Sequence, residues 1–337
     1  MKSADLLQLR DVYMSRVDAK RDLLTQQLRK KFDKDLGGGS KSIDAHIQQH
    51  LIGRVRLMFH TIFPWIGLFS DLPGATIYEL GPGTGATTSA LGMVAKAVRA
   101  YDISSDSSDI ARSRCSLLGI ENVLVEATSP ERLLARIVED AAHSPPTIIF
   151  MFAVLEHMTL SERLTTLKTC WEQLADGGLL VIGDTPNRLV YRHGHTSREP
   201  FFDMVPDELM AHFADQFPNR DFGEALSSWR TAGQPDTKIS SQIDRWGRGV
   251  SFHEFEVAIG SVSTHLIASG LESPITRAMP LVKEEILLMR FLSAECPNVP
   301  LGFGRASLYL ILRKGNSGSA RRELESEELL RQALSLM

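Results

Sequence analysis

The feature that most constrains this chain is a short apolar run that leads through an acidic residue into alternating glycines. Residues 76–80 read T-I-Y-E-L, residues 81–85 read G-P-G-T-G, and a helix-forming segment begins at Ala86. Glycine lacks a Cβ atom and tolerates positive φ, so such a turn brings bare backbone close to a ligand. The following helix N-terminus adds unpaired N–H groups and a positive dipole end. The segment therefore predicts a strand–turn–helix unit that binds a nucleotide-like cofactor.

Two cofactor classes compete for this turn. Gly81, Gly83 and Ala86 fit the dinucleotide pattern G-x-G-x-x-A. Read from Glu79 to Gly85, the same segment follows E-x-G-x-G-x-G, which resembles motif I of the class I S-adenosylmethionine (SAM) dependent methyltransferases. Glu79 favours the second interpretation, because a carboxylate beside the turn opposes a pyrophosphate but suits a ligand that carries an ammonium and a sulfonium.

The segments that follow occur in the order typical of that family. The L-E-H of residues 155–157 resembles the end of motif IV in many small-molecule methyltransferases, including those of quinone biosynthesis. An L-x-x-G-G turn at residues 174–178 is also typical of the family. Strands are predicted at residues 76–80, 97–102, 122–126, 147–152 and 179–184, with a helix over residues 161–174. Residues 75–187 thus resemble a class I methyltransferase, with a further likeness to bacterial small-molecule and sugar enzymes of the quinone-methyltransferase-like group.

This resemblance implies an α/β fold with a seven-stranded, mostly parallel sheet flanked by helices. The sixth strand is expected over residues 273–280, and residues 306–313 are the best candidate for a seventh, antiparallel strand. The expected parts are an N-terminal helical extension (1–70), a SAM-binding Rossmann-like core (71–187), an inserted substrate-recognition segment after the fifth strand (188–250), the C-terminal part of the core (251–314), and a linker with a terminal helix (315–337).

The N-terminal extension has apolar residues at helical spacing. Residues 1–36 are predicted to form one long amphipathic helix, followed by a glycine-rich hinge at residues 37–40. This helix either packs on the core or a second copy of the chain, or closes over the cofactor as a lid, and packing is the favoured interpretation. Residues 43–69 predict further helices that are buried beside the sheet, with a membrane-surface location as the alternative.

The resemblance assigns the cofactor residues one by one. The glycines let the backbone approach SAM, Glu79 holds the methionine ammonium directly or through water and backbone, and Asp102 binds the ribose hydroxyls. For Glu126 the alternative stays open that it is simply an acidic residue at the end of a strand, without a cofactor contact. The predicted cofactor contacts are Glu79, Gly81, Pro82, Gly83, Thr84, Gly85, Asp102, Ile103, Glu126, Ala127, Thr128, Phe152 and Ala153.

The acceptor side rests on residues after the fourth and fifth strands. His157, His193 and His195 are candidate general bases, with structural roles as the alternative. No metal site is expected, because the paired histidines with Asp184 or Asp203 have no third ligand at a diagnostic spacing. The predicted substrate contacts are Asp184, Asn187, Arg188, Tyr191 and Arg192.

Composition limits the function classes. The formal net charge of −4 gives no basis for nucleic-acid binding. The charged N-terminus shows no signal-peptide pattern, and the most apolar stretch carries too many polar residues for a membrane span, so a cytoplasmic location is expected. Peripheral membrane contact, a homodimer, or a partner bound through the terminal helices stays open.

The leading hypothesis is a SAM-dependent enzyme that methylates a hydroxyl of a polar small molecule or saccharide and releases S-adenosylhomocysteine. The aromatic, His- and Arg-rich insert supports a polar acceptor. The alternatives are a non-catalytic SAM-binding scaffold and, less favoured, an NAD-dependent oxidoreductase that shares the glycine turn and Asp102.

Overall fold

The computed structural model describes residues 3–36, 40–192, 194–315, 327, 330–332 and 334. The chain divides into two compact units, which we call unit 1 and unit 2. Unit 1 contains Met1–Phe150, Gln173–Leu179 and Glu272–Met279. Unit 2 contains Met151–Glu172, Leu180–Leu271 and Pro280–Met337.

In the part of the chain that the structure describes, seven strands form one sheet with the strand order β3-β2-β1-β4-β5-β7-β6. The first three strands pair in parallel, and β7 is antiparallel to β6. The expected fold, that of the class I methyltransferases, is therefore confirmed. The strands are β1 (Thr76–Leu80), β2 (Ala97–Asp102), β3 (Val123–Ala127), β4 (Ile148–Phe152), β5 (Leu179–Pro186), β6 (Leu266–Ala268) and β7 (Ser307–Arg313).

The apolar runs of the sequence explain the central strands. All five residues of β4, I-I-F-M-F, are buried, as are the first five of β5. Continuous apolar runs are typical of strands covered on both faces of a parallel sheet. The loops at the carboxyl ends of such strands are where ligands bind in open α/β sheets, so the fold places the predicted cofactor residues at the expected edge.

Local sequence signals set the helices of unit 1. The helix α6 (Ala86–Val94) begins directly after Gly85, and α7 (Ser105–Leu117) begins after Ser104, whose hydroxyl accepts the N–H of Ser107. Such a cap satisfies one of the unpaired N–H groups at a helix start. A third helix, α8 (Pro130–His143), has proline in its first turn, where no N–H donor is needed.

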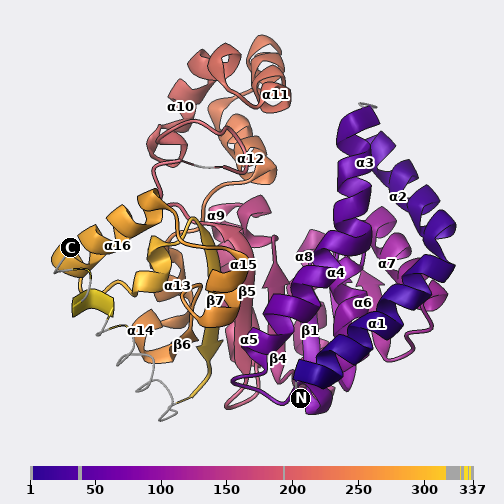
Figure 1. The fold of residues 1–337 in the computed structure, drawn as a ribbon. Coiled ribbons are helices and arrows are strands. Elements are labelled where there is room, and N and C mark those ends of the chain that lie inside the picture. The colour runs from indigo at the N-terminus through magenta and orange to yellow at the C-terminus, as the bar shows by residue number, and fades with distance from the viewer. Residues whose placement is uncertain are drawn as a thin grey trace. The chain divides into compact units, whose positions relative to one another are not determined.

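The N-terminal residues form two helices rather than the single long helix predicted. α1 (Ser3–Ala19) and α2 (Arg21–Leu36) are separated at Lys20, whose N–H bonds the carbonyl of Val17 in a tighter i→i−3 turn. Their apolar stripe is buried, and the hydroxyls of Tyr13 and Ser89 of α6 lie 2.7 Å apart. Both helices contact the helices of unit 1 (Figure 1), which favours packing over a lid. Of the predicted hinge at residues 37–40, residues 37–39 lie outside the described residues, and Ser40 begins the next helix.

Residues 40–66 are helical throughout and contain two π-helical turns. Leu51, Val55, Phe59, Phe63 and Trp65 are all buried, so the structure supports the core interpretation of this segment over the membrane-surface one. Among the described residues, no helix is both long and apolar enough to span a bilayer. The successive elements are α3 (Ser40–Gln48), η1 (Gln49–Gly53), α4 (Arg54–Leu57), η2 (Met58–Ile62) and α5 (Phe63–Ile66).

The predicted position of the sixth strand, residues 273–280, is wrong. Residues 273–278 form the helix α15 (Ser273–Ala278), and the strand is the three-residue β6. Pro274 explains the helix, because proline fits the first turn of a helix and is disfavoured inside a sheet. Two short helices, α13 (Phe252–Ile259) and α14 (Val262–His265), precede β6 and are separated at Gly260, which has φ 88°.

The insert after β5 folds around a small core of its own within unit 2. Its helices are α10 (Asp207–Met210), α11 (Arg220–Thr231) and α12 (Asp236–Trp246), which gather together in Figure 1. Trp229 and Trp246 pack against this core. The buried members of the cluster are Phe202, Met210, Ala214, Phe217, Phe222, Leu226, Ile239 and Ile243.

Buried arginines fasten the insert to the rest of unit 2. Arg163 of α9 (Leu160–Gln173) is 1% exposed and donates to the carbonyl of Gly249 at 3.1 Å. Its guanidinium also lies 3.1 Å from a carboxylate oxygen of Glu254. Arg248 pairs with Asp203 and Asp207. Because a buried charge is costly unless paired, these contacts hold the C-terminal end of the insert against α9 and against residues 203–207.

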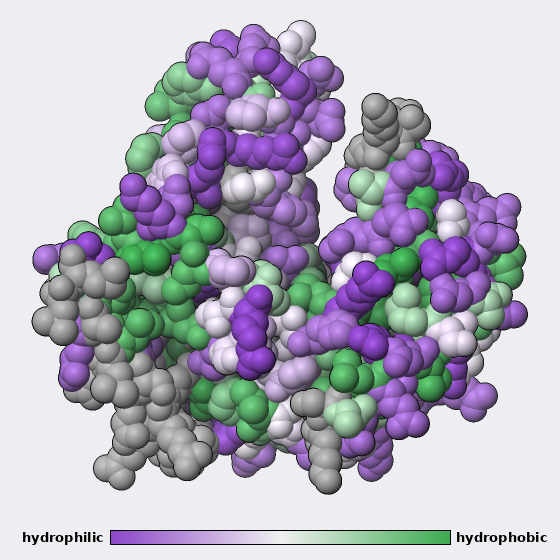
Figure 2. Space-filling view, in the orientation of Figure 1, coloured by the Kyte–Doolittle hydropathy of each residue, from purple (hydrophilic) through white to green (hydrophobic). Residues whose placement is uncertain are grey.

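The described part of the terminal helix packs on unit 2. Leu334 joins a buried cluster with Met289 and Leu292 of α16 (Lys283–Glu295), and Arg331 donates to the carbonyl of Val299 at 2.6 Å. The surface of α16 is partly apolar (Figure 2), and Leu287 and Phe291 are exposed there. A partner bound through the terminal helices stays a prediction.

Candidate functional site

The three glycines of the turn after β1 all have positive φ: 71° at Gly81, 52° at Gly83 and 74° at Gly85. Their surroundings differ. A Cβ added to Gly83 would meet no atom within 4 Å, whereas one on Gly85 would lie 2.7 Å from the Cα of Ala111 in α7. Gly83 therefore leaves bare backbone beside open space, and Gly85 permits close packing of two helices. These are distinct reasons for glycine within one motif.

Asp102, at the end of β2, holds the glycine turn. Its Oδ2 accepts the N–H of Gly83 at 3.0 Å, and its Oδ1 accepts the N–H of Ser104 at 2.8 Å. Burial raises the pKa of Asp102, and these two backbone donors lower it. A carboxylate has about four lone-pair positions, so each oxygen retains capacity for a hydroxyl donor. The residue can thus shape the turn and still bind a ribose.

Glu79 is a buried acid beneath the turn. Its side chain is only 1% exposed, and Thr87 of α6 donates to its Oε1 at 2.5 Å. Oε2 is buried and accepts no hydrogen bond from the residues that the structure describes. Burial raises the pKa of Glu79 to about 7, and the hydroxyls of Thr87 and Thr88 partly oppose this. A neighbouring positive charge on a ligand would favour the ionised form.

The N-terminal segment also contacts the glycine turn. Local sequence patterns do not indicate this contact. Nδ1 of His50, in the π-turn η1, lies 2.6 Å from Oγ1 of Thr84. Arg114 of α7 is buried and donates to the carbonyls of Thr84 at 3.2 Å and His50 at 2.9 Å. Burial, aided by Arg54 and Arg114, lowers the pKa of His50 to about 2, so this imidazole is neutral.

The residues predicted to flank an adenine follow β2 and β3. The N–H of Thr128 donates to the carbonyl of Asp102 at 2.9 Å, and the side chain of Ile103 is 51% exposed. Glu126 instead forms an ion pair with Arg136 of α8 at 2.8 Å. This contact gives Glu126 a structural role, whereas Ile103 offers an apolar surface next to Asp102.

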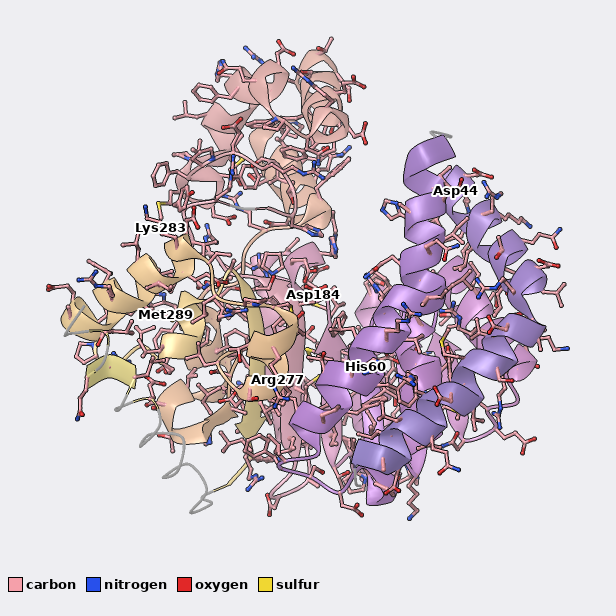
Figure 3. The ribbon with its side chains drawn as sticks, viewed as in Figure 1. Asp44, His60, Asp184, Arg277, Lys283 and Met289 are labelled. Carbon is pink, nitrogen blue, oxygen red and sulfur yellow. The ribbon has the colours of Figure 1, made fainter. Side chains whose placement is uncertain are left out.

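The ends of β4 and β5 carry strained backbone in unit 2. Ala153 (φ 53°) and Asp184 (φ 51°) have positive φ although neither is glycine. Ala153 donates to the carbonyl of Gly183 at 2.9 Å, and a Cβ on Gly183 would lie 2.7 Å from the ring of Phe152. Strain of this kind is concentrated at functional positions. Asp184, labelled in Figure 3, accepts the hydroxyl of Tyr309 at 3.4 Å.

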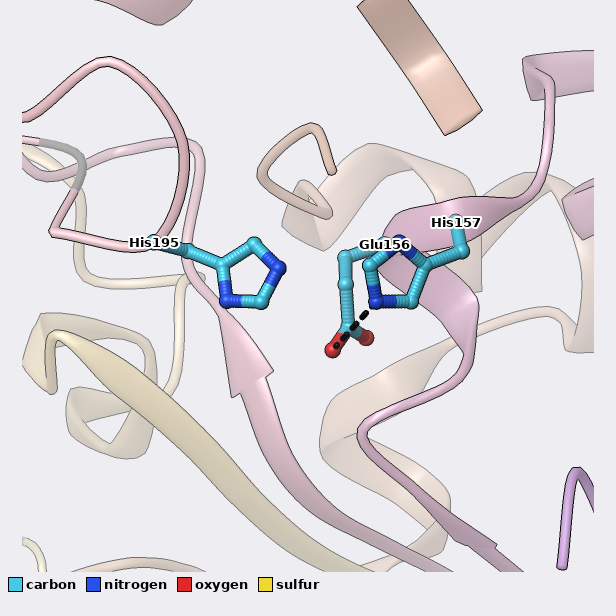
Figure 4. A group of neighbouring side chains, drawn as sticks. All are labelled: Glu156, His157 and His195. Atoms are coloured by element: carbon cyan, nitrogen blue, oxygen red, sulfur yellow. Dashed lines mark ion pairs between the residues drawn. The ribbon is translucent and has the colours of Figure 1, made fainter. Parts of the chain in front are cut away.

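Two of the three predicted histidines meet in unit 2, as Figure 4 shows. His157 ends the short helix η4 (Leu155–His157), and its ring centroid lies 5.2 Å from that of His195. The carboxylate of Glu156, which is fully buried, lies 3.8 Å from Nε2 of His157. Glu156 was not among the predicted site residues. His193 lies outside the described residues.

The predicted substrate contacts have unequal environments. The amide of Asn187 is buried and donates to the carbonyls of Phe303 at 2.5 Å and Arg305 at 2.8 Å, which is a structural role. The hydroxyl of Tyr191 lies 3.4 Å from Glu284, and its ring is 38% exposed. Arg192 is exposed and Arg188 is partly buried, so both remain candidates for an acceptor contact.

Several solved structures resemble this chain at low sequence identity. No protein-family model and no curated protein sequence matches the chain. A magnesium protoporphyrin IX methyltransferase from Synechocystis, solved with bound S-adenosylhomocysteine (SAH), is 12% identical with a TM-score of 0.45, over 80% of this chain and 86% of that one. The YcgJ protein of Bacillus subtilis is 14% identical with a TM-score of 0.40, over 77% of this chain and 99% of that one.

The N-methyltransferase NodS from Bradyrhizobium japonicum, also solved with SAH, is 21% identical with a TM-score of 0.28, over 35% of this chain and 54% of that one. The chain also spans 63% of the length of a similar rRNA methylase from Streptococcus thermophilus. The strand order and the antiparallel β7, rather than these likenesses, define the fold as that of the class I methyltransferases.

The two glycines of the turn give a matched test of these roles. We expect Gly85→Ala to lower the melting temperature more than Gly83→Ala. Both variants carry the cost of positive φ, about 1–2 kcal/mol, but only alanine at position 85 collides with Ala111. Differential scanning calorimetry measures the two shifts, and equal shifts would contradict the packing role of Gly85.

The buried carboxyl of Glu79 predicts a pH-dependent stability. Its folded-state pKa of about 7 exceeds the ordinary value of 4.5, so the folded protein binds more protons than the unfolded chain between these values. The proton that Glu79 binds in the folded state therefore stabilises the protein fully below pH 4.5. This stabilisation is lost as the pH rises to about 7, and the resulting decrease in the free energy of unfolding is at most about 3 kcal/mol.

Urea unfolding of the wild type and Glu79→Gln at pH 5 and pH 8 isolates this effect, because the variant keeps the shape and lacks the titrating proton. We expect the wild type to lose stability relative to the variant at the higher pH. A difference between the two proteins that does not change with pH would show that Glu79 does not titrate as described.

Proposed function

We propose that this protein is a SAM-dependent methyltransferase. The observation that carries the proposal is the joint geometry of Gly83 and Asp102: bare backbone at positive φ beside open space, held by a carboxylate at the end of the adjacent parallel strand. The buried Oε2 of Glu79 adds an unsatisfied acceptor beneath the same turn. This combination fits a cofactor with ribose hydroxyls and a cationic amino-acid end, and it does not fit a pyrophosphate.

The residues of unit 1 would hold SAM, which supplies a methyl group activated on a sulfonium. In this proposal, Asp102 accepts hydrogen bonds from the ribose hydroxyls, and the backbone around Gly83 approaches the methionine end of SAM. Glu79 holds the methionine ammonium through the backbone of the turn. Ile103, Ala127 and Thr128 flank the adenine. Phe152 and Ala153, at the end of β4, are assigned to the methionine part on the resemblance alone.

The acceptor is proposed to be a hydroxyl of a polar small molecule or saccharide, handled by residues of unit 2. In such a transfer the acceptor oxygen forms a bond to the methyl carbon, the carbon–sulfur bond breaks, and its electron pair stays on sulfur. The hydroxyl proton must leave, and the imidazoles of His157 and His195 can accept it. The exposed Tyr191 and Arg192 supply an aromatic face and a charge for a polar ligand.

Transfer of a labelled methyl group from SAM to a panel of hydroxylated acceptors tests this function. We expect turnover by the wild type, loss of SAM binding in Asp102→Ala, and a fall in turnover of about 100-fold or more in the His157→Ala/His195→Ala double variant, which keeps SAM binding. His212→Ala, which changes an exposed histidine of the same unit, is the control and should behave as wild type.

The contrary outcomes separate the rival functions. SAM binding without transfer to any acceptor, together with a stable protein partner, would favour a non-catalytic SAM-binding scaffold. Binding of NADH in place of SAM would favour an oxidoreductase. Full turnover by the double histidine variant would leave the methyltransferase in place but remove the proposed proton acceptors.

A further inference from the structure

We infer that Glu156, His157 and His195 form a binding site for a divalent first-row transition-metal ion such as Zn²⁺ or Co²⁺. Each residue offers one ligand atom, and these atoms all lie within 4.8 Å of one another. Figure 4 shows the rings of His157 and His195 on either side of the Glu156 side chain, whose carboxylate lies beside the ring of His157. The sequence spacing does not indicate this ligand set, because Glu156 and His157 are adjacent residues and His195 lies far along the chain.

The distances are close to those that a bound ion requires. Metal–ligand bonds of 2.0–2.2 Å at tetrahedral angles place ligand atoms about 3.4 Å apart. Nε2 of His157 is already 3.8 Å from Oε1 of Glu156. His195 is exposed, so a small rotation of its side chain can bring the third ligand into range without disturbing buried structure.

The ring of His157 is held in the orientation that a metal ligand needs. Its Nδ1 lies 3.0 Å from the carbonyl of Arg245, and an N–H donor at this position requires the proton to sit on Nδ1. Nε2, which faces Glu156, is then the nitrogen that carries a lone pair. The guanidinium of Arg245 donates in return to the carbonyl of His157 at 3.0 Å and to Glu162 at 2.5 Å. Metal-binding histidines typically donate their other ring N–H to a carbonyl or carboxylate, as Nδ1 of His157 does here.

The end of α12 also positions the other two ligands. The N–H of Arg248 donates to the carbonyl of Glu156 at 2.8 Å, and the hydroxyl of Thr196 donates to the carbonyl of Gly247 at 2.6 Å. Gly247 has φ 127°, and a Cβ there would lie 2.4 Å from Cδ2 of His195. A side chain at position 247 would therefore displace the imidazole from this place. One short segment, residues 245–248, thus organises all three ligands.

The ligand set selects the kind of ion. Two imidazoles and one carboxylate suit Zn²⁺, Co²⁺, Ni²⁺ or Fe²⁺, whereas Mg²⁺ and Ca²⁺ prefer oxygen ligands. Three protein ligands leave at least one coordination position open, as in catalytic rather than structural zinc sites. The exposed His195 is consistent with a site that a second ligand can reach.

A role for the ion in turnover rests on the proposed function. An acceptor hydroxyl in the open position would have its pKa lowered by the cation, so that its proton could leave to solvent. In that case His157 and His195 act as ligands rather than as the proton acceptors. The binding of the metal itself is independent of that function.

Cobalt titration of the tag-free full chain, first stripped with chelator, tests the site by visible absorption and calorimetry. We expect one Co²⁺ per chain with the intense ligand-field bands of a four- or five-coordinate ion, displaced by Zn²⁺. His195→Ala should weaken binding at least about 100-fold, and His212→Ala should leave it unchanged. Because His195 is exposed, this variant is expected to fold, and Glu156→Gln provides an isosteric second test.

Binding that is equal in the wild type and His195→Ala, or weak binding without the ligand-field bands, would overturn the inference. SAH titration of the same samples distinguishes the two proposals. SAH binding without a metal site would refute only the metal inference, and a metal site without SAH binding would refute only the proposed function.

Discussion

The hydrogen bond from the N–H of Gly83 to the carboxylate of Asp102 is the contact on which the candidate cofactor site depends. It joins the turn after β1 to the end of β2, two parallel strands whose register places them side by side. The contact requires a left-handed residue at position 83 and an acid at position 102. The same hydrogen bond thus sets the shape of the turn and holds the carboxylate in the position proposed for ribose binding.

Around this contact, the chain places charged groups where burial makes them costly. Glu79 lies beneath the turn with a pKa raised to about 7, and the buried Arg114 joins the turn to His50. In unit 2, Glu156 is buried beside His157, and Arg163 and Arg248 have carboxylate partners. Groups of this kind contribute little net stability compared with apolar residues of the same size. Their presence is better explained by ligand binding and by the positioning of loops.

The parts of the fold that sequence predicts are those set by local pattern. The strands β1 and β2 have the predicted bounds, and β3, β4 and β5 differ from theirs by one or two residues at an end. The predicted position of the sixth strand was wrong, because a three-residue strand after a short helix has too few residues to show an alternating apolar pattern. His50 and the Glu156 ligand set were missed for another reason. Their contacts arise from a π-turn and from the end of α12, which local spacing does not encode.

The central claim is that the turn held by Asp102 binds SAM rather than a dinucleotide. Calorimetric titration of the full chain with SAH and, separately, with NADH tests it most directly. We expect micromolar binding of SAH with one site per chain and no saturable binding of NADH, because the buried acid Glu79 beside the turn disfavours a pyrophosphate. Saturable binding of NADH with no binding of SAH would contradict the account.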